Sequence, residues 1–246
     1  MRIKVINGNT YAAMTANIDA QARAAARPET VIVTSQPARG PTTIETYYDE
    51  YLAIPGILEE IIKDEANFDA FVLACWGDPG IEAAREITTK PVIGIAEASL
   101  YVANTLGAKW GVVTTLERTK HQVEKTVEKV GLWSHCVQVL CSDLPVASTE
   151  DDRDGTADIL EQGARQVIAK GAEVIILGCA GMSGLDQILS ARLGLPVIDS
   201  VAAAIVYAEA LVQLGKRTSK WMTYRPPEMK EIKGYPDYMQ PKNLKQ

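Results

Sequence analysis

Four cysteines carry the most reactive side chains of this chain: Cys75, Cys136, Cys141 and Cys179. No two of them have the CxxC spacing typical of zinc sites, and the two histidines do not cluster with them at metal-ligand spacing. The sequence also lacks the GxGxxG pattern of dinucleotide-binding turns. We therefore expect no metal, no other cofactor and no structural disulfide. Thiols without such partners can act as nucleophiles or as acids and bases.

Two of these thiols occupy equivalent places in an internal repeat. Residues 68–98 align with residues 171–204: each copy has an apolar run, a Cys at its end, a Gly five residues later and a Pro-Val-Ile further on. The proline follows Cys75 by sixteen residues and Cys179 by seventeen. The repeat therefore predicts that these two cysteines form a functional pair. The other two cysteines have no counterpart, and we interpret them as packing residues.

An opposed pair of thiols suits one kind of reaction. A stereocentre can be inverted without a cofactor when one group removes a proton from one face of the carbon and another delivers a proton to the opposite face. Because each cysteine precedes a predicted helix, we expect the helix dipole to favour its thiolate. Backbone N–H groups in the turns that follow would bind carbonyl oxygens and stabilise an enolate. These turns are formed by Trp76, Gly77 and Asp78, and by Ala180, Gly181 and Met182.

The elements that must position this pair follow from the apolar pattern. Eight β-branched runs of strand length alternate with longer amphipathic stretches, which is typical of βα units in parallel sheets. Together with the repeat, the pattern predicts an α/β fold of two pseudo-symmetric Rossmann-like lobes, each a four-stranded parallel sheet flanked by helices. We assign residues 1–98 to the first lobe, joined by a C-terminal helix and arm over residues 206–246, and residues 99–205 to the second. The active site is expected in the cleft between the lobes.

Composition limits the partners of the chain. Its 246 residues have a net charge of −6, which argues against nucleic acid as a partner. No continuous apolar run reaches membrane-spanning length, so no membrane partner is expected. The first residues enter a strand-like run without a secretory signal, which favours the cytoplasm. A small molecule is the expected partner.

Six motifs carry a resemblance to a known family. They are VINGNT at the first strand, ARGPTTIE after the second, ACWGDPG around Cys75, PVIGIAEA after it, LGCAGM around Cys179 and LGKRTSK near the C-terminus. Over nearly its whole length the chain resembles hydantoin racemases of the aspartate/glutamate racemase superfamily. The resemblance implies a cofactor-independent racemase of 5-substituted hydantoins. It also implies that each of the two cysteines deprotonates one enantiomer while the other reprotonates it.

The resemblance further implies contacts with the substrate at the first strand. Asn9 and Thr10 would hold a polar edge of the ring, although Gly8 stands where the family pattern has proline. Trp76 also departs from the family, which more often has phenylalanine there, so the pocket for the 5-substituent is expected to differ in shape. The alternative for Asn9 and Thr10 is a role as an N-cap of the helix that follows.

Two further pairs are predicted near the ligand. Pro41 and Thr42 belong to a turn-rich loop that could close over the cleft, and the resemblance places them nearest the ligand. Thr114 and Thr115 end the first strand of the second lobe, where the first lobe has its Asn-Gly turn, and helix capping is the alternative for them. Capping is also the alternative for Asp78.

The tail of the chain differs in composition from the rest. Residues 216–246 contain eight Lys or Arg against three acidic residues, together with four prolines. Such a segment is unlike a further sheet unit and is interpreted as an arm that packs on the cleft rim or on a neighbouring subunit. We favour the neighbouring subunit, and with it a homo-oligomer.

Three functions are open at this level. The first is a hydantoin racemase, with allantoin racemase as its nearest variant because allantoin is itself a hydantoin. The second is another reaction of the superfamily, such as decarboxylation or cis–trans isomerisation. The third is a non-enzymatic two-lobed protein whose cleft closes on a small ligand. The paired cysteines favour the first.

Overall fold

Two parallel sheets form the framework of the molecule. The computed structural model describes residues 1–244, apart from the side chains of residues 150 and 151. Each sheet has four strands, in the orders β2-β1-β3-β4 and β6-β5-β7-β8, so the same topology occurs twice. Every adjacent pair of strands runs parallel. The predicted α/β fold with two four-stranded parallel sheets is confirmed.

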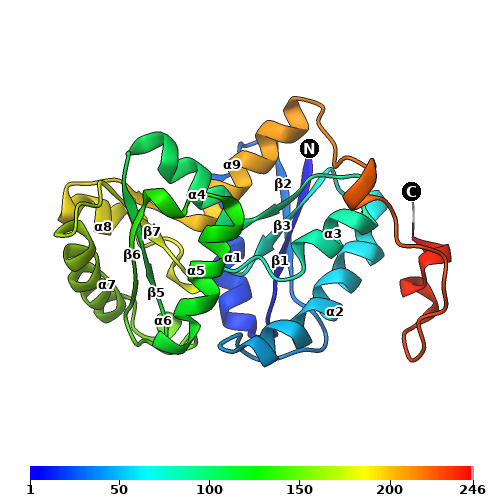
Figure 1. Cartoon of the computed structure of the whole chain (residues 1–246), viewed down its shortest axis with the longest axis horizontal. Coiled ribbons are helices and arrows are strands. Elements are labelled where there is room, and N and C mark those ends of the chain that lie inside the picture. Colours follow the sequence, from blue (N-terminus) through cyan, green and yellow to red (C-terminus); the bar gives the residue numbers. More distant parts are fainter. Residues whose placement is uncertain (245–246) are drawn as a thin grey trace.

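The strands are short, and the central strands of both sheets are buried apart from Arg2 at the start of the first strand. The first sheet consists of β1 (Arg2–Asn7), β2 (Val31–Ser35), β3 (Ala70–Ala74) and β4 (Val92–Gly94). The second sheet consists of β5 (Trp110–Thr114), β6 (Cys136–Cys141), β7 (Val174–Leu177) and β8 (Val197–Ile198). All residues of β3 and β7 are buried, as expected for strands that are covered on both faces. In Figure 1 the first sheet lies on the right and the second on the left.

Helices connect the strands and cover both sheets. In the first half of the chain they are α1 (Ala12–Ala25), α2 (Tyr47–Asp64), α3 (Ile81–Ile87) and α4 (Ile95–Leu106). In the second half they are α5 (Lys120–Val130), α6 (Ser148–Asp151), α7 (Arg153–Ile168), α8 (Asp186–Leu193) and α9 (Ser200–Gln213). Side-chain oxygens cap the N-termini of α2 and α9. Thr46 accepts the Asp49 N–H at α2, and Asp199 accepts the N–H groups of Val201 and Ala202 at α9.

Two helices, α4 and α9, join the lobes. Helix α4 follows the last strand of the first sheet but also packs on β7 and β8 of the second. Helix α9 follows the last strand of the second sheet but packs on β3 and β4 of the first, and the two helices contact each other. Their buried faces are rich in alanine, including Ala98 and Ala103 on α4 and Ala204 and Ala208 on α9. Small side chains let helices approach closely, so this crossed pair fixes one sheet against the other.

The segment after α9 lies on the first lobe. The hydroxyl of Thr218 donates to the Lys90 carbonyl at 2.8 Å, and the ammonium of Lys220 donates to the Glu86 carbonyl at 3.1 Å. In Figure 1 the C-terminal segment lies at the outer side of the first lobe, away from the second. Residues 245 and 246, the end of the predicted arm, lie outside the described residues. The first part of the arm therefore packs on its own chain.

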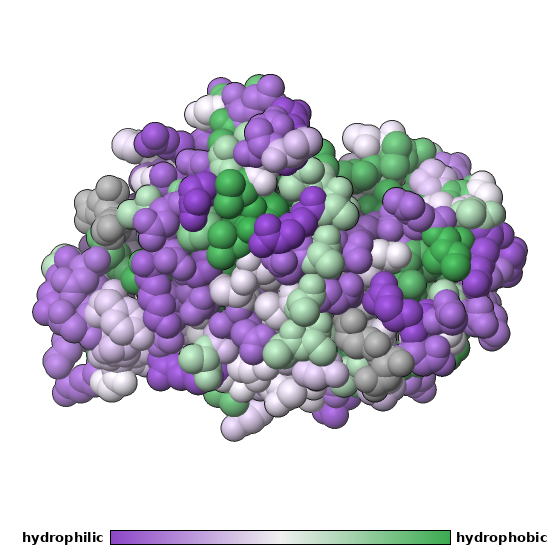
Figure 2. All heavy atoms as spheres, turned by 180° about the vertical axis from the view of Figure 1, so that it is seen from behind, coloured by the Kyte–Doolittle hydropathy of each residue, from purple (hydrophilic) through white to green (hydrophobic). Residues whose placement is uncertain are grey.

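The surface of the molecule is mixed. The face seen in Figure 2 is mainly hydrophilic, with hydrophobic side chains gathered in separate patches. Across residues 1–244, no helix combines the length and the apolar character that crossing a membrane requires.

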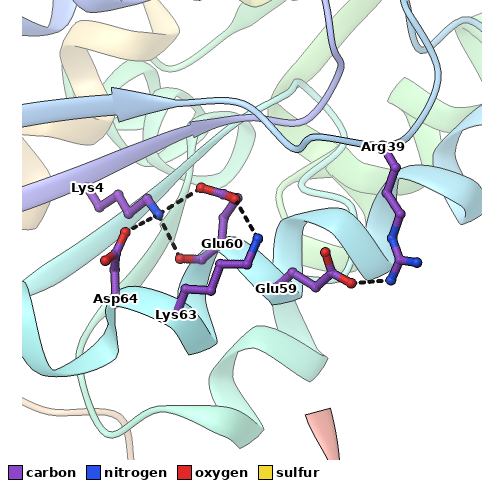
Figure 3. Close-up of polar contacts among 6 residues, drawn as sticks. All are labelled: Lys4, Arg39, Glu59, Glu60, Lys63 and Asp64. Atoms are coloured by element: carbon purple, nitrogen blue, oxygen red, sulfur yellow. Dashed lines mark hydrogen bonds and ion pairs between the residues drawn. The ribbon is translucent and has the colours of Figure 1, made fainter. Parts of the chain in front are cut away.

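A buried lysine ties α2 to the first sheet (Figure 3). The side chain of Lys4, on β1, is 1% exposed. Its Nζ lies 2.9 Å from a carboxylate oxygen of Glu60 and 2.6 Å from one of Asp64, and it also donates to the Glu60 carbonyl at 2.8 Å. Lys63 approaches the other carboxylate oxygen of Glu60 only from the surface, at 3.5 Å. An ammonium removed from water needs such partners, and Lys4 has two carboxylates and a carbonyl.

The charge of Lys4 sets the ionisation of its partners. At Glu60, burial alone would raise the pKa of the carboxyl group, but the hydrogen bond and the charge of Lys4 outweigh burial and the pKa is lowered from 4.5. At Asp64, the hydrogen bond from Lys4 is the main cause that lowers the pKa from 3.8. A lowered folded-state pKa stabilises the fold above the ordinary pKa and loses this effect as the pH falls through the folded value.

We predict that Lys4→Met lowers the free energy of unfolding at pH 7 by about 3 kcal/mol, because it leaves the Glu60 carboxylate buried without its main partner. Lys63→Met, which removes an exposed charge beside the same carboxylate, should cost less than about 0.5 kcal/mol. Urea unfolding followed by circular dichroism measures both. The difference between the variants should shrink below pH 4, where the carboxyl groups take up protons. Equal costs for both variants would contradict this account.

Candidate active site

A cavity of about 220 Å³ lies between the lobes. It opens where the central strands of the two sheets end: Cys75 directly follows β3, and Cys179 follows β7 after one glycine. Both cysteines line this cavity, together with residues of both lobes. The duplicated topology thus brings the two repeat cysteines to one pocket.

The pocket includes eight of the residues predicted from the sequence. These are Asn9, Cys75, Trp76, Gly77, Thr114, Thr115, Cys179 and Ala180. The other predicted residues do not line it: Thr10, Pro41, Thr42, Asp78, Gly181 and Met182. They lie in segments next to pocket residues, and their hydrogen bonds show what holds several of them there.

The turn after Cys75 has an unusual backbone. Gly77 has a φ of 133°, a conformation that side chains rarely adopt, and its missing side chain faces no atom within 4 Å. The preceding residue, Trp76, is held by a hydrogen bond: its indole N–H donates to the Ser200 hydroxyl on α9 at 3.1 Å. The turn is therefore held against the helix that joins the lobes.

Asp78 does not line the pocket but binds the backbone at the start of α4. Its two carboxylate oxygens accept the backbone N–H groups of Ala96 and Glu97 at 3.0 and 2.9 Å, at the first turn of α4. A Cβ on Gly94 would lie 2.0 Å from its carboxylate carbon, so only glycine leaves room for it there. The capping alternative raised from the sequence therefore describes the hydrogen bonds of Asp78, which accepts N–H groups of α4. Burial, followed by the charge of Glu97, raises the pKa of Asp78 to about 7.

The turn after β1 is organised by asparagine side chains. The side-chain amide N–H of Asn7 donates to the side-chain oxygen of Asn9 at 2.8 Å, and this oxygen also accepts the Tyr11 N–H at 2.9 Å. Asn9 thus satisfies an N–H at the start of α1 while it lines the pocket. Thr10 instead donates through its N–H and its hydroxyl to the Pro41 carbonyl, at 3.0 and 3.2 Å. This pair fixes the loop after β2 beside the pocket.

The corresponding position in the second lobe carries threonines. Thr114 is buried, and its hydroxyl donates to the Gly178 carbonyl at 2.9 Å, one residue before Cys179. Thr115 is also buried, and its carbonyl accepts the Asp143 N–H at 2.9 Å. Thr114 therefore supports the strand end that carries the second cysteine.

The turn after Cys179 is a short 3₁₀ helix, Ala180–Met182. The Met182 N–H donates to the Cys179 carbonyl at 3.1 Å, just as the Asp78 N–H donates to the Cys75 carbonyl at 3.0 Å. The two cysteine turns share this closing hydrogen bond. Each turn then leads into a helix only later, at Ile81 in the first lobe and at Asp186 in the second.

The environment of Cys75 differs from the sequence-based expectation. We expected a helix dipole to favour the thiolate, but the next helix begins six residues further on. Burial instead raises the pKa of the Cys75 thiol well above its ordinary value of 9.0, and the negative charges of Cys179, Glu50 and Asp78 raise it further. In the free protein at neutral pH, Cys75 is therefore a thiol. The effect of Cys179 also indicates that the two sulfurs are close enough to influence each other.

Two helices supply pocket residues that were not predicted from the sequence. Helix α2 places its first turn at the pocket, and α5 runs along it in the second lobe. The residues from these helices and the turn before α5 are Tyr47, Glu50, Thr119, Gln122, Val123, Lys125, Thr126 and Lys129. Several of those at α5 recur at intervals of three and four, which predicts a helical face. The sequence alone does not reveal that this face meets the cleft.

Two polar contacts connect α5 with helices α2 and α3 of the first lobe. The amide of Gln122 donates to a carboxylate oxygen of Glu50 on α2 at 2.6 Å. The ammonium of Lys129 pairs with Glu82 on α3. Both contacts join the second lobe to the first, and Glu50, Gln122 and Lys129 line the pocket.

Fold and pocket together define an α/β protein with a thiol from each of two equivalent sheets in one cleft. The chain's other two cysteines, Cys136 and Cys141, do not line it, and burial raises their pKa values to about 11 and about 12. Within the described residues, no group of three or more histidine, cysteine or acidic side chains could hold a metal ion.

Several known proteins that match nearly the whole chain are named racemases. The family model described as Asp/Glu/Hydantoin racemase matches residues 3–208. The hydantoin racemase of Pseudomonas sp. (strain NS671) is 50% identical over 236 residues, which cover 95% of each chain. The solved allantoin racemases from Klebsiella pneumoniae and Pseudomonas fluorescens both superpose with a TM-score of 0.92, at 41% and 40% identity. They match 95% of this chain and 96% and 100% of their own.

The chain belongs to the Asp/Glu/hydantoin racemase family, and it is an enzyme, a racemase. This result decides among the three functions that the sequence left open. The non-enzymatic binding protein, the decarboxylase and the cis–trans isomerase are set aside, because the relatives that match nearly the whole chain at 40% identity or more are racemases.

We predict that the cost of ionising buried Asp78 appears in the pH dependence of stability. A folded-state pKa of about 7, raised from 3.8, stabilises the fold below pH 3.8, and this effect is lost as the pH rises through 7. Asp78→Asn removes the ionisation and loses one N–H···O bond, a loss that is the same at every pH. From pH 4 to pH 8, the free energy of unfolding of the variant should therefore rise relative to that of the wild type. Urea unfolding measures this difference. A constant difference between the two proteins would contradict the assignment.

Proposed function

We propose that the enzyme interconverts the D and L forms of 5-monosubstituted hydantoins, with Cys75 and Cys179 as the two acid–base groups and without a cofactor. One observation carries the proposal: both thiols line one pocket and follow the equivalent central strands β3 and β7. The relative named hydantoin racemase, 50% identical over nearly the whole chain, supports this substrate class.

The reaction is a proton exchange at C5 of the ring. The thiolate of one cysteine takes the C5 proton, and the electron pair of the broken C–H bond moves into the adjacent C4 carbonyl to give an enolate. The thiol of the other cysteine then gives its proton to the opposite face of C5. Substrate and product are mirror images, and the thiol and the thiolate have exchanged places. The reverse reaction uses the same two groups in exchanged roles.

Backbone N–H groups would stabilise the enolate oxygen. In the two cysteine turns, the N–H groups of Asp78 and Met182 are engaged with the cysteine carbonyls. We therefore assign the contact with the substrate to Trp76, Gly77 and Ala180, the turn residues that line the pocket. Thr114, Thr115 and Asn9 would hold the remaining polar edge of the ring, while Thr10, Pro41 and Thr42 support the loop beside it.

The raised pKa of Cys75 fits a pair that shares one proton. Because each thiolate raises the pKa of the other, the pair loses its two protons in separate steps, and the active form has one thiol and one thiolate. The two enantiomers are equal in free energy, so kcat/KM must have the same pH dependence in both directions.

Allantoin racemase is the second candidate function. Allantoin is itself a hydantoin with a ureido group at C5, so the same two thiols would act on it. The two solved allantoin racemases, at 41% and 40% identity, support this candidate.

We also propose that the enzyme acts in the cytoplasm as a homo-oligomer. Cysteines that are all outside disulfides suit a reducing compartment. The arm carries large apolar side chains that stay exposed in the single chain, among them Trp221 at 83% and Met229 at 70%. Such side chains are typical of a surface that another subunit covers.

A chain that ends at Lys220 tests the role of the arm. We expect it to sediment as a smaller species than the full-length protein at equal concentration, because the exposed apolar side chains of the arm are gone. Analytical ultracentrifugation measures this, with the circular dichroism spectrum as the control for folding. Identical sedimentation of a folded truncated chain would contradict a role of the arm in assembly.

Cys75→Ala and Cys179→Ala test the two thiols. Each is expected to lower kcat/KM for racemisation by at least about 100-fold, because a proton donor or acceptor is lost from one face. In deuterium oxide, each variant should still exchange the C5 proton of one enantiomer without inverting it, and the two variants should exchange opposite enantiomers. Chiral chromatography and mass spectrometry measure both quantities.

Cys141→Ala serves as the matched control, since this thiol lies outside the pocket, and it should keep wild-type activity. The proposal would be wrong if either pocket variant kept more than about a tenth of the wild-type kcat/KM.

A further inference from the structure

A carboxylate lines the pocket beside the thiols, and the reaction gives it no evident task. Glu50 projects from the first turns of α2 and is half-buried. Its negative charge raises the pKa of Cys75, so it works against the thiolate that abstracts the proton. The same charge would disfavour a nearby enolate. A group that hinders the chemistry in this way needs another reason for its place.

The carboxylate is held in position across the cleft. Its side-chain hydrogen bond comes from Gln122 of α5, at 2.6 Å, and within the described part of the chain no other side chain donates to it. A carboxylate has about four acceptor positions, and Gln122 occupies one. The amide oxygen of Gln122, on the same pocket wall, is a further acceptor. The α2–α5 side of the pocket therefore offers several acceptors for N–H groups of a ligand.

The neighbouring residues add a donor. Lys125, one turn along α5 from Gln122, lines the same pocket and can donate to a carbonyl oxygen. Glu50 and Lys125 together match a group in which N–H donors flank a carbonyl. A ureido group has this pattern, and its parallel N–H bonds can meet both oxygens of one carboxylate. An apolar group of the same shape would cover the carboxylate without replacing its hydrogen bonds to water, which is costly.

We propose that Glu50, positioned by Gln122, determines the specificity of the enzyme for hydantoins whose 5-substituent carries N–H donors, with a ureido group as the best fit. This inference rests on the proposed function, because it concerns the substituent of a substrate whose ring binds between the two thiols. It adds a selection step at the α2–α5 side of the pocket, separate from the proton transfer at C5.

Two substrates of equal shape test the proposal. 5-Ureidohydantoin, which is allantoin, and 5-isobutylhydantoin have substituents with four non-hydrogen atoms in the same branched arrangement. Only the ureido substituent has N–H groups. For the wild type we expect kcat/KM to be about 10- to 100-fold higher for the ureido compound, the range for a charge-assisted hydrogen bond. In Glu50→Gln, which keeps the shape and removes the charge, this ratio should fall towards 1. In Gln122→Ala it should fall in the same direction, because the carboxylate loses its support.

Glu82→Gln is the matched control. It removes the same charge and breaks another contact between the lobes, but Glu82 does not line the pocket. The ratio between the two substrates should stay at its wild-type value in this variant. A loss of folded protein lowers both rates equally and leaves the ratio unchanged, so the ratio reports specificity alone. Glu50→Asp, which withdraws the carboxylate by one methylene, provides a second variant and should also lower the ratio.

The outcomes are distinguishable. An unchanged ratio of kcat/KM between the two substrates in Glu50→Gln, including an equal loss for both, would overturn the role of Glu50 in recognising the 5-substituent. The racemase proposal would still stand. A wild type that prefers the isobutyl compound would have the same two consequences. A wild type that racemises neither compound above the enzyme-free rate would overturn the proposed function itself, and this inference with it.

Discussion

The crossed packing of α4 and α9 is the contact on which the site depends. Two thiols can act on opposite faces of one carbon only if their separation is fixed, and they are carried by different sheets. Each of these helices follows the last strand of one sheet and packs on the central strand of the other. Because the buried faces of both helices are rich in alanine, the helices pack closely and there is little room for sliding. Asp78 and Trp76 then attach the first cysteine turn to these two helices, at Ala96 of α4 and Ser200 of α9.

The burial of Cys75 in the pocket between the lobes affects its ionisation. Cys75 lies in a pocket where burial and three nearby negative groups all oppose a thiolate. A shared proton between the two thiols is the arrangement that such surroundings favour, since two adjacent thiolates would repel each other at low dielectric. In the proposed reaction the pair holds one proton before and after the transfer and two while the enolate exists, so a single negative charge moves between the two sulfurs and the substrate.

Much of this arrangement could be predicted from the sequence because the sequence contains it as an internal repeat. Matching apolar strands followed by Cys75 and Cys179 imply one topology used in both halves, and parallel strands place their carboxyl ends at the same edge of a sheet. Contacts that depend on how elements turn towards each other were not predictable. The hydrophobic pattern of α5 fixes which face is buried but not that Gln122 meets Glu50, 72 residues earlier in the sequence.

The missed features have the same physical origin. In the sequence, Lys4 is a charged residue within an otherwise apolar strand. Its burial requires carboxylates, and these come from α2, about 60 residues later. Asp78 follows a cysteine in the sequence, yet its hydrogen bonds go to the helix after the next strand. The expected helix dipole at Cys75 was wrong because the start of a helix depends on the turn that separates it from the strand, and here this turn is six residues long.

The isotopic content of the first product molecules tests the central claim, that two different thiols serve the two faces of the carbon. One enantiomer of a 5-substituted hydantoin is converted in deuterium oxide to less than about a tenth, and each enantiomer is then analysed for deuterium at C5 by chiral chromatography and mass spectrometry. The account predicts a product that carries deuterium in nearly every molecule, since its new proton comes from a thiol already exchanged with solvent, and a remaining substrate that carries almost none. A product that retains the original proton would show that one group removes and returns it, and would contradict the two-thiol account.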